Sequence, residues 1–209
     1  MERSKEYETE QESFWAGDFG DEYIARNRDK KLISKNIAKF ARILSRTRDV
    51  GSVIEYGSNI GLNLMAIHQL LPDAELSAAE INEKAVRELK KLNYLREIHH
   101  GSVLDLRPER QYDLVFTCGL LIHINPDKIE KLYALLHDSS RRYILVSEYY
   151  NPVPVEVIYR GHRRKLFKRD FAGEMLDMFS DLYLVDYGFI YHRDPTFPED
   201  DGTWFLLSK

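Results

Sequence analysis

Two glycines and two glutamates in the first half of the chain have a spacing suited to binding a ligand. The run 55–61, Glu-Tyr-Gly-Ser-Asn-Ile-Gly, follows a short apolar stretch, and Glu80 comes 25 residues after Glu55. Gly57 can adopt backbone angles closed to residues with a Cβ atom, so the chain can turn sharply there. We expect Gly61 to permit a close approach between the next helix and the ligand. A carboxylate at Glu80 could accept hydrogen bonds from both hydroxyls of a ribose.

The glycine spacing also separates two classes of cofactor. Glycines at i and i+4, with an acid at i−2, differ from the Gly-x-Gly-x-x-Gly pattern that binds the pyrophosphate of dinucleotides. The spacing therefore argues against a nicotinamide-dependent oxidoreductase and favours a zwitterionic ligand without phosphate. Further candidate residues follow two later apolar runs. Because ligands of parallel sheets bind at the carboxyl ends of the strands, we expect one crevice to contain Gly101, Ser102, Val103, Cys118 and Gly119.

His123 is the candidate general base. It lies five residues after Cys118, where a substrate and a cofactor would meet, and histidine is the side chain most suited to proton transfer near neutral pH. The alternative is a packing or helix-capping histidine between Ile122 and Ile124. Candidate substrate-binding residues at the end of a later apolar run, on the same expected rim, are Glu148, Tyr149 and Tyr150.

A strongly basic segment lies at residues 160–169. It carries six formal positive charges in an otherwise acidic chain. Such a run is often a solvated face. The alternative is recognition of an anionic acceptor, because arginine side chains match carboxylate and phosphate oxygens. We expect this segment to be a loop at the acceptor site, and the candidate binding residues in it are Arg160, Arg163 and Arg164.

The N-terminal segment, residues 1–47, is predicted to be helical. Two glycines interrupt its aromatic-rich stretch 14–23 and predict a turn between short helices. The aromatic side chains in this stretch recur every fourth residue, at Trp15, Phe19 and Tyr23. This spacing places them on one side of a helix. They either pack the segment onto the rest of the chain or belong to a lid over the ligand, with Arg26 or Asn27 near a ligand carboxylate. Farther along, apolar residues recur at helical intervals over 32–44, and the polar face opposite them is expected to carry Lys35, Lys39 and Arg42.

From residue 48 to 209 strand and helix patterns alternate within one predicted domain. The strand patterns cover 53–56, 74–80, the region of Ile98, 112–118 and 143–150, and the helical patterns cover 62–71, the region after the N-cap Asn82, 127–137 and 170–179. This order predicts an α/β fold with a parallel sheet covered on both faces. Two final strand patterns, 182–191 and 203–207, are joined by a polar turn and predict an antiparallel hairpin.

Composition excludes several classes of protein. The 209 residues carry 30 Lys and Arg against 34 Asp and Glu, so the net charge of −4 gives no positive field for nucleic acid. Cys118 is the only cysteine, so no intramolecular disulfide can form. The charged N-terminus is unlike a secretion signal, and no apolar run is long enough for a membrane span. His99 and His100 diverge on a strand and predict no metal site. We expect a cytoplasmic protein that binds neither nucleic acid nor membrane.

The ordered set of glycines, acids and strands resembles the class I S-adenosylmethionine-dependent methyltransferases. The resemblance implies a Rossmann-like fold with a seven-stranded, mostly parallel sheet, a C-terminal antiparallel hairpin and N-terminal helices. It also implies S-adenosylmethionine as the cofactor, with Gly57, Gly61, Cys118 and Gly119 near its methionine part and Glu80 on its ribose. Adenine would lie against Ile81, Ser102 and Val103, and Glu55 would order the glycine loop. The other implied cofactor contacts are Ser58, Asn59, Gly101, Tyr23, Arg26 and Asn27.

A closer resemblance covers nearly the whole chain. The segments 14–27, 119–127 and 200–204 are similar to methylases associated with pseudaminic acid biosynthesis. This resemblance implies a small anionic acceptor, a pseudaminic-acid-type sugar or its nucleotide-linked form. The alternative from another functional class is a domain that binds S-adenosylmethionine without catalysis and uses its basic segment to dock a partner.

Overall fold

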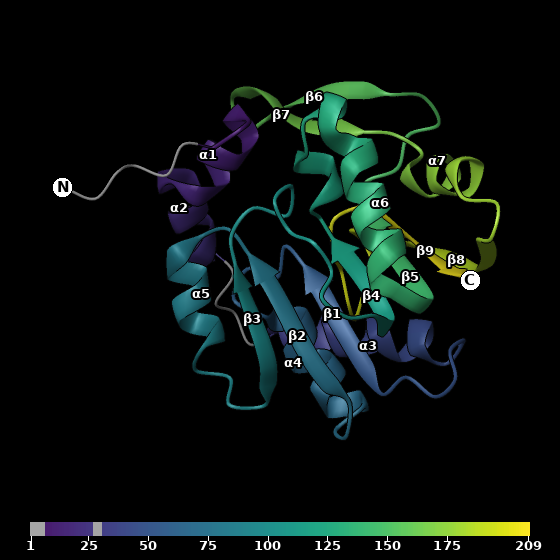
Figure 1. Cartoon of the computed structure of the whole chain (residues 1–209). Coiled ribbons are helices and arrows are strands. Elements are labelled where there is room, and N and C mark those ends of the chain that lie inside the picture. The colour runs from purple at the N-terminus through teal and green to yellow at the C-terminus, as the bar shows by residue number, and fades with distance from the viewer. Residues whose placement is uncertain (1–6, 27–30) are drawn as a thin grey trace.

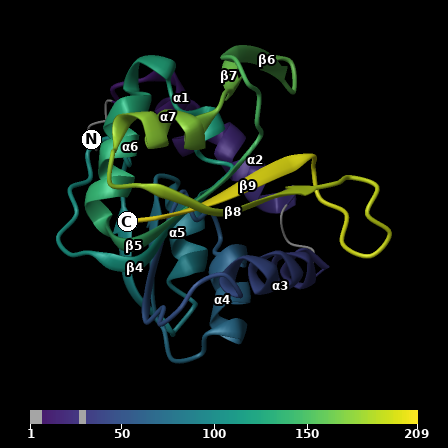
Figure 2. The ribbon, with the colours of Figure 1, turned by 90° about the vertical axis from the view of Figure 1, so that its right-hand side faces the viewer.

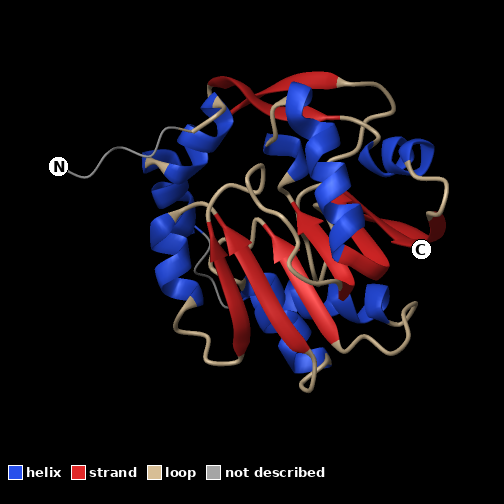
Figure 3. Cartoon of the chain, in the orientation of Figure 1, coloured by secondary structure: helices blue, strands red, loops and turns tan. Residues whose placement is uncertain are grey.

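The computed structural model describes residues 7–26 and 31–209 and has a seven-stranded sheet at its centre (Figures 1 and 3). The strands of this sheet are β1 (Ser52–Tyr56), β2 (Glu75–Glu80), β3 (Leu95–His100), β4 (Tyr112–Cys118), β5 (Ser140–Glu148), β8 (Tyr183–Ile190) and β9 (Gly202–Ser208). Their order is β3-β2-β1-β4-β5-β9-β8. The first five in this order are parallel, and β9 runs antiparallel between β5 and β8. The predicted parallel sheet and C-terminal hairpin are confirmed.

Helices cover both faces of the sheet. They are α1 (Glu10–Ala16), α2 (Asp18–Arg26), α3 (Lys31–Leu44), α4 (Leu62–Leu70), α5 (Glu83–Leu89), α6 (Ile129–Ser139) and α7 (Phe171–Met178), with two short 3₁₀ helices, η1 (Leu121–His123) and η2 (Pro126–Lys128). One face packs against α3, α4 and α5, and the other packs against α6 and α7. No helix in these described ranges is long and apolar enough to cross a membrane.

The side-chain alternation of β1 explains this two-faced core. Val53 packs with α3 and α4, whereas Ile54 and Tyr56 face α6. All three are buried, and burying a side chain of this size stabilises a fold by roughly 1.5–3 kcal/mol. Strand β1 is therefore held by packing on both faces, and this fixes the position at which the following loop begins.

Asn82 joins two parts of the chain. Its Oδ1 accepts a hydrogen bond from the Ala85 amide (3.0 Å), so it caps α5 as the sequence predicted. Its Nδ2 donates to the carbonyl oxygen of Trp15 (3.2 Å) and to Asp21 (2.9 Å). One side chain thus starts α5 and anchors α1 and α2 above it. The predicted turn between short N-terminal helices lies at Gly17, so the three aromatic residues are divided between the two helices.

The basic segment 160–169, expected to be a loop, belongs instead to a two-stranded hairpin, so that prediction was wrong. It consists of β6 (Val155–Tyr159) and β7 (His162–Lys168), which pair antiparallel. Arg160 and Gly161 form the turn with positive φ angles, 49° and 87°, a conformation typical of tight hairpin turns. In Figure 1 the hairpin lies with α1 above the carboxyl ends of the strands. The dense basic residues of β7 conceal its strand pattern.

Candidate functional site

A cavity of about 710 Å³ lies at the carboxyl ends of the parallel strands. Its floor is formed by the loops after β1, β2, β3 and β4, and residues of α1, α2 and the β6–β7 turn line its upper part. Small-molecule sites typically occupy about 300–1,000 Å³. The space is therefore sufficient for a cofactor together with a small second ligand.

Most of the candidate residues from the sequence line this cavity. They are Tyr23, Arg26, Gly57, Ser58, Asn59, Glu80, Ile81, Ser102, Val103, Cys118, Gly119, His123, Glu148, Tyr149 and Arg160. The structure does not bring into the lining Glu55, Gly61, Gly101, Tyr150, Arg163 or Arg164. The remaining candidate, Asn27, lies outside the described residues.

The loop after β1 turns sharply at Gly57. The amides of Gly57 and Ser58 both donate to the carbonyl oxygen of Ala79 on β2 (2.9 and 3.1 Å), which ties the loop to the neighbouring strand. Gly57 has a φ of 78°, and a Cβ atom there would lie 3.0 Å from Leu120. The positive φ therefore favours glycine at this position, and a side chain there would press against Leu120.

Gly61 has a different role from the expected one. Its φ is 83°, and a Cβ atom would lie 2.8 Å from Leu89 and 2.9 Å from Leu92. These leucines belong to α5 and the turn after it, not to the cavity. Gly61 thus allows the start of α4 to pack closely on the α5 region, whereas the sequence suggested close approach to a ligand.

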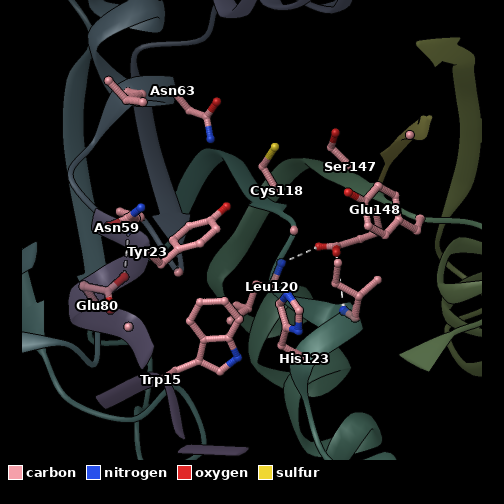
Figure 4. A pocket seen from close by; sticks show the side chains of 18 of the residues that line it. Trp15, Tyr23, Asn59, Asn63, Glu80, Cys118, Leu120, His123, Ser147 and Glu148 are labelled. Atoms are coloured by element: carbon pink, nitrogen blue, oxygen red, sulfur yellow. Dashed lines mark hydrogen bonds between the residues drawn. The ribbon is translucent and has the colours of Figure 1, made fainter. Parts of the chain in front are cut away.

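Glu80 is buried at the end of β2 and supports two loops (Figure 4). Its two carboxylate oxygens accept hydrogen bonds from the amides of Asn59 and Asn82, both at 2.7 Å. Burial raises the pKa of this carboxyl, and the backbone donors partly oppose that effect. Each carboxylate oxygen has a second lone pair, so Glu80 can accept hydrogen bonds from a ligand while it holds both loops.

Glu55 lies beneath the loop and outside the cavity lining. It is fully buried, and its Oε1 accepts a hydrogen bond from Nδ2 of Asn63 (2.6 Å). Burial raises the pKa of Glu55 to about 8, so the carboxyl holds a proton at neutral pH. Asn63 itself lines the cavity, and Glu55 therefore fixes the orientation of a lining side chain.

This proton predicts a pH dependence of stability. Between the ordinary pKa of 4.5 and about 8, the folded protein keeps a proton on Glu55 that the unfolded chain releases. The free energy of unfolding must therefore fall as pH rises through this range, by up to about 1.4 kcal/mol per pH unit. We expect Glu55→Gln to flatten the slope between pH 7 and 8 in urea denaturation. An unchanged slope would contradict a neutral Glu55.

His123 ends η1 and faces the cavity, where its ring lies beside Trp15 (centroids 4.5 Å apart) and Tyr159 (5.1 Å). Its Nδ1 lies 2.5 Å from the carbonyl oxygen of Lys165. Because a carbonyl only accepts, Nδ1 must carry the proton. Burial lowers the pKa of His123 to about 4, so Nε2 is an unprotonated acceptor. No residue in the described part of the chain hydrogen-bonds this Nε2.

Glu148 lines the cavity, but its carboxylate is engaged by backbone groups (Figure 4). It accepts hydrogen bonds from the amides of Leu120 and Leu121 (both 3.1 Å) and Ile122 (3.4 Å). Burial raises its pKa to about 7. Glu148 therefore holds the first turn of η1 in place and, through it, His123.

The two tyrosines after Glu148 point to different places. The Tyr149 hydroxyl donates to Asp200 (2.8 Å), and both residues line the cavity. Tyr150 is exposed and packs against Phe205 of β9 (5.9 Å between centroids). This division follows from the alternation of side chains along an extended chain.

The basic segment is largely structural. Glu10 of α1 pairs with Arg164 (3.1 Å) and Lys165 (2.9 Å), and these contacts join α1 to β7. Arg169 pairs with Glu174 of α7 (2.7 Å). The arginine of this segment that reaches the cavity lining is Arg160, at the hairpin turn.

The structure adds lining residues that the sequence interpretation missed. Lys39, expected on a polar face, has a side chain only 5% exposed, with Nζ 3.2 Å from Glu199 Oε2 and 3.6 Å from Cys118 Sγ. Tyr159 was missed because the β6–β7 hairpin that carries it was not predicted. The β-branched residues Val155, Val157 and Ile158 were a possible signal for that hairpin, but no local pattern identifies the partner of Lys39. No cluster of three or more metal-ligating side chains exists within the described ranges.

No protein-family model and no curated protein sequence matches this chain. Solved structures do match at low identity. Magnesium protoporphyrin IX methyltransferase from Synechocystis PCC 6803, with bound S-adenosylmethionine, is 13% identical over 98% of this chain and 100% of that chain, with a TM-score of 0.68. The 1,6-didemethyltoxoflavin-N1-methyltransferase of Burkholderia thailandensis is 14% identical over 95% and 86% of the two chains, with a TM-score of 0.67.

A glycopeptide N-methyltransferase complexed with sinefungin has a TM-score of 0.62 and 14% identity over 82% of this chain and 93% of that chain. The chain therefore has the class I methyltransferase fold, which confirms the predicted fold class. None of these comparisons supports the narrower resemblance to the pseudaminic acid methylases, which stays a prediction.

Proposed function

We propose that this protein transfers a methyl group from S-adenosylmethionine to a small-molecule acceptor. The observation that carries the proposal is the pairing of a buried acid, Glu80, with a loop that turns sharply at Gly57, both in the floor of one cavity. Glu80 keeps acceptor capacity for ribose hydroxyls while it holds the loops. The hydrogen-bonding groups of the lining and the volume of the cavity fit this cofactor.

The lining residues divide into three parts along the cofactor. Adenine would lie against Ile81, Ser102 and Val103, and the ribose on Glu80. The methionine part would follow the glycine loop toward the end of β4, near Cys118 and Gly119. Tyr23 and Arg26 of α2 would cover it, and the guanidinium of Arg26 already lies over the rings of Phe19 (5.1 Å) and Tyr23 (5.6 Å).

S-adenosylmethionine supplies an activated methyl group on a sulfonium, which leaves as a neutral thioether. The protein's contribution is to orient the acceptor in line with that methyl group and to exclude water. His123 is the candidate residue for the first task. Its neutral imidazole presents Nε2 as an acceptor for an O–H or N–H of the acceptor. With a pKa of about 4, it is a weak base and acts mainly by orientation.

We assign the acceptor to the class of small anionic sugars, of the pseudaminic acid type or its nucleotide-linked form. The sequence resemblance of segments 14–27, 119–127 and 200–204 supports this assignment. Arg160 in the cavity lining supports it as well, since a guanidinium binds carboxylate or phosphate oxygens in a two-pronged geometry.

The test of the function has two stages. Calorimetry first measures binding of S-adenosylhomocysteine, for which we expect a micromolar Kd. The protein is then incubated with labelled S-adenosylmethionine and a set of anionic sugars and sugar nucleotides, and mass spectrometry looks for a product heavier by one methyl group. Absence of binding would overturn the proposal. Binding without any methylated product would favour the non-catalytic, cofactor-binding domain.

Arg160 provides a test of the acceptor class. We expect Arg160→Ala to raise the KM for an anionic acceptor about tenfold, because one charge-assisted contact is lost, while Kd for S-adenosylhomocysteine stays unchanged. Steady-state kinetics measures this effect. Arg163→Ala is the matched control, because Arg163 lies in the same hairpin and outside the cavity lining. Equal KM values for the two variants would remove Arg160 from the acceptor site.

A further inference from the structure

Two lysines of helix α3, Lys35 and Lys39, line the cavity, and we consider the second of them. The Lys39 side chain is 5% exposed and lines the cavity. A buried ammonium group is costly unless it has a partner of opposite charge. The charged partner of Lys39 is Glu199, in the loop between β8 and β9, at 3.2 Å. Figure 2 shows this loop extending past the sheet near α3.

The other polar groups near Lys39 do not replace Glu199. Cys118 Sγ lies 3.6 Å away, and burial raises the pKa of that thiol, so it stays protonated. Glu55 also acts on the charge of Lys39, but its pKa of about 8 leaves it mostly neutral at pH 7. The ammonium therefore depends on one carboxylate, and the Glu199 side chain is 21% exposed, so it can reach solvent.

The position of Lys39 in the sheet order identifies which end of the cofactor it meets. Glu80 ends β2, the glycine loop follows β1, and Cys118 ends β4, and these strands are neighbours in the order β2-β1-β4. A cofactor with its ribose on Glu80 and its thioether chain along the glycine loop must place its amino-acid end at β4. Lys39 contacts the β4 residue Cys118, and Figure 4 shows Cys118 and Asn63 on the opposite side of the cavity from Trp15 and His123.

We propose that Lys39 is the counter-ion of the cofactor's methionine carboxylate and exchanges Glu199 for it when the cofactor binds. This inference rests on the proposed function and adds a residue to it. The exchange replaces one carboxylate by another, so the buried ammonium remains paired throughout. Glu199 and the neighbouring Asp200, which accepts from Tyr149 at the acceptor side, belong to the same loop. Release of Glu199 thus connects cofactor binding to the acceptor side of the cavity.

The experiment compares ligands with and without the carboxylate. Binding of S-adenosylhomocysteine, decarboxylated S-adenosylmethionine and 5′-methylthioadenosine is measured by calorimetry for the wild type and Lys39→Met. We expect Lys39→Met to weaken S-adenosylhomocysteine about tenfold, the loss of one charge-assisted contact, and to leave the other two ligands within about twofold. Lys31→Met is the matched control, because Lys31 is an exposed lysine at the start of α3 outside the cavity lining.

A second variant tests the exchange without altering Lys39. Glu199→Gln removes the competing carboxylate, so S-adenosylhomocysteine should bind about threefold more tightly, the scale of a partly exposed ion pair. The same substitution in the Lys39→Met background should have no effect. An equal loss for all three ligands in Lys39→Met, or no loss for any, would overturn the inference. If the wild type bound none of the three ligands, the proposed function itself would be wrong. That result is distinct from the two outcomes that overturn only the role of Lys39.

Discussion

Replacing Glu80 with alanine should weaken binding of S-adenosylhomocysteine about 100-fold. The carboxylate is expected to accept two ribose hydroxyls, and hydrogen bonds to a charged group are worth about 1.5–3 kcal/mol each. Calorimetry with the purified variant measures the loss. The structure adds a second effect, because Glu80 also accepts from the amides of Asn59 and Asn82. Without the carboxylate these amides lose their acceptor, so the variant should also melt at a lower temperature.

Two further variants separate these effects. Glu80→Gln keeps one acceptor oxygen and the shape of the side chain, so we expect a smaller fall in melting temperature with a loss of affinity of about tenfold. Glu83→Ala removes an exposed carboxylate three residues away and outside the cavity lining, and it should change neither quantity. Normal affinity in a well-folded Glu80→Ala variant would show that position 80 does not hold the ribose.

Glu148→Ala is expected to reduce the free energy of unfolding by about 3 kcal/mol. The carboxylate accepts from three backbone amides at the start of η1, and a buried donor left without an acceptor costs about 1–3 kcal/mol. Urea denaturation at pH 8, where a carboxyl with a pKa of about 7 is ionised, measures the change. Turnover should fall as well, because η1 carries His123.

The controls for this prediction are a conservative and a remote substitution. Glu148→Gln retains an oxygen that can accept from Leu120 and Leu121, so it should lose less stability than alanine. Glu130→Ala, on the exposed side of α6, should have an effect within about 0.5 kcal/mol. A loss below about 1 kcal/mol in Glu148→Ala would mean that η1 keeps its place without this carboxylate.

The parts of the fold that depend on local pattern could be predicted. The strand that ends at Tyr56, the turn at Gly57 and the cap at Asn82 depend on neighbouring residues, and the structure has all three. The parallel sheet and the C-terminal hairpin followed from the alternation of elements. The hairpin at 155–168 was missed because five of the seven residues of β7 are Lys, Arg or His, which conceals the apolar pattern of a strand.

The residues of the site likewise include some that local sequence could predict and others that it could not. Residues at the strand ends, such as Glu80 and Cys118, could be placed from the sequence because parallel strands share one edge. Lys39 could not, because its burial depends on Glu199, 160 residues farther along the chain. Glu148 was predicted at the rim, but its three amide donors come from a segment 26–28 residues earlier. Contacts between distant segments leave no periodic trace in the sequence.

The attachment of α1 has a consequence for the order of folding. Gln11 donates to the backbone oxygen of Arg164 (2.9 Å), and Glu10 pairs with Arg164 and Lys165. On the ribosome, the first helix must wait for about 150 further residues before these partners emerge. Contacts that close such long loops form late, because the chain must first bring distant segments together. The first helix should therefore be among the last elements to dock, after the sheet that carries its partners has formed.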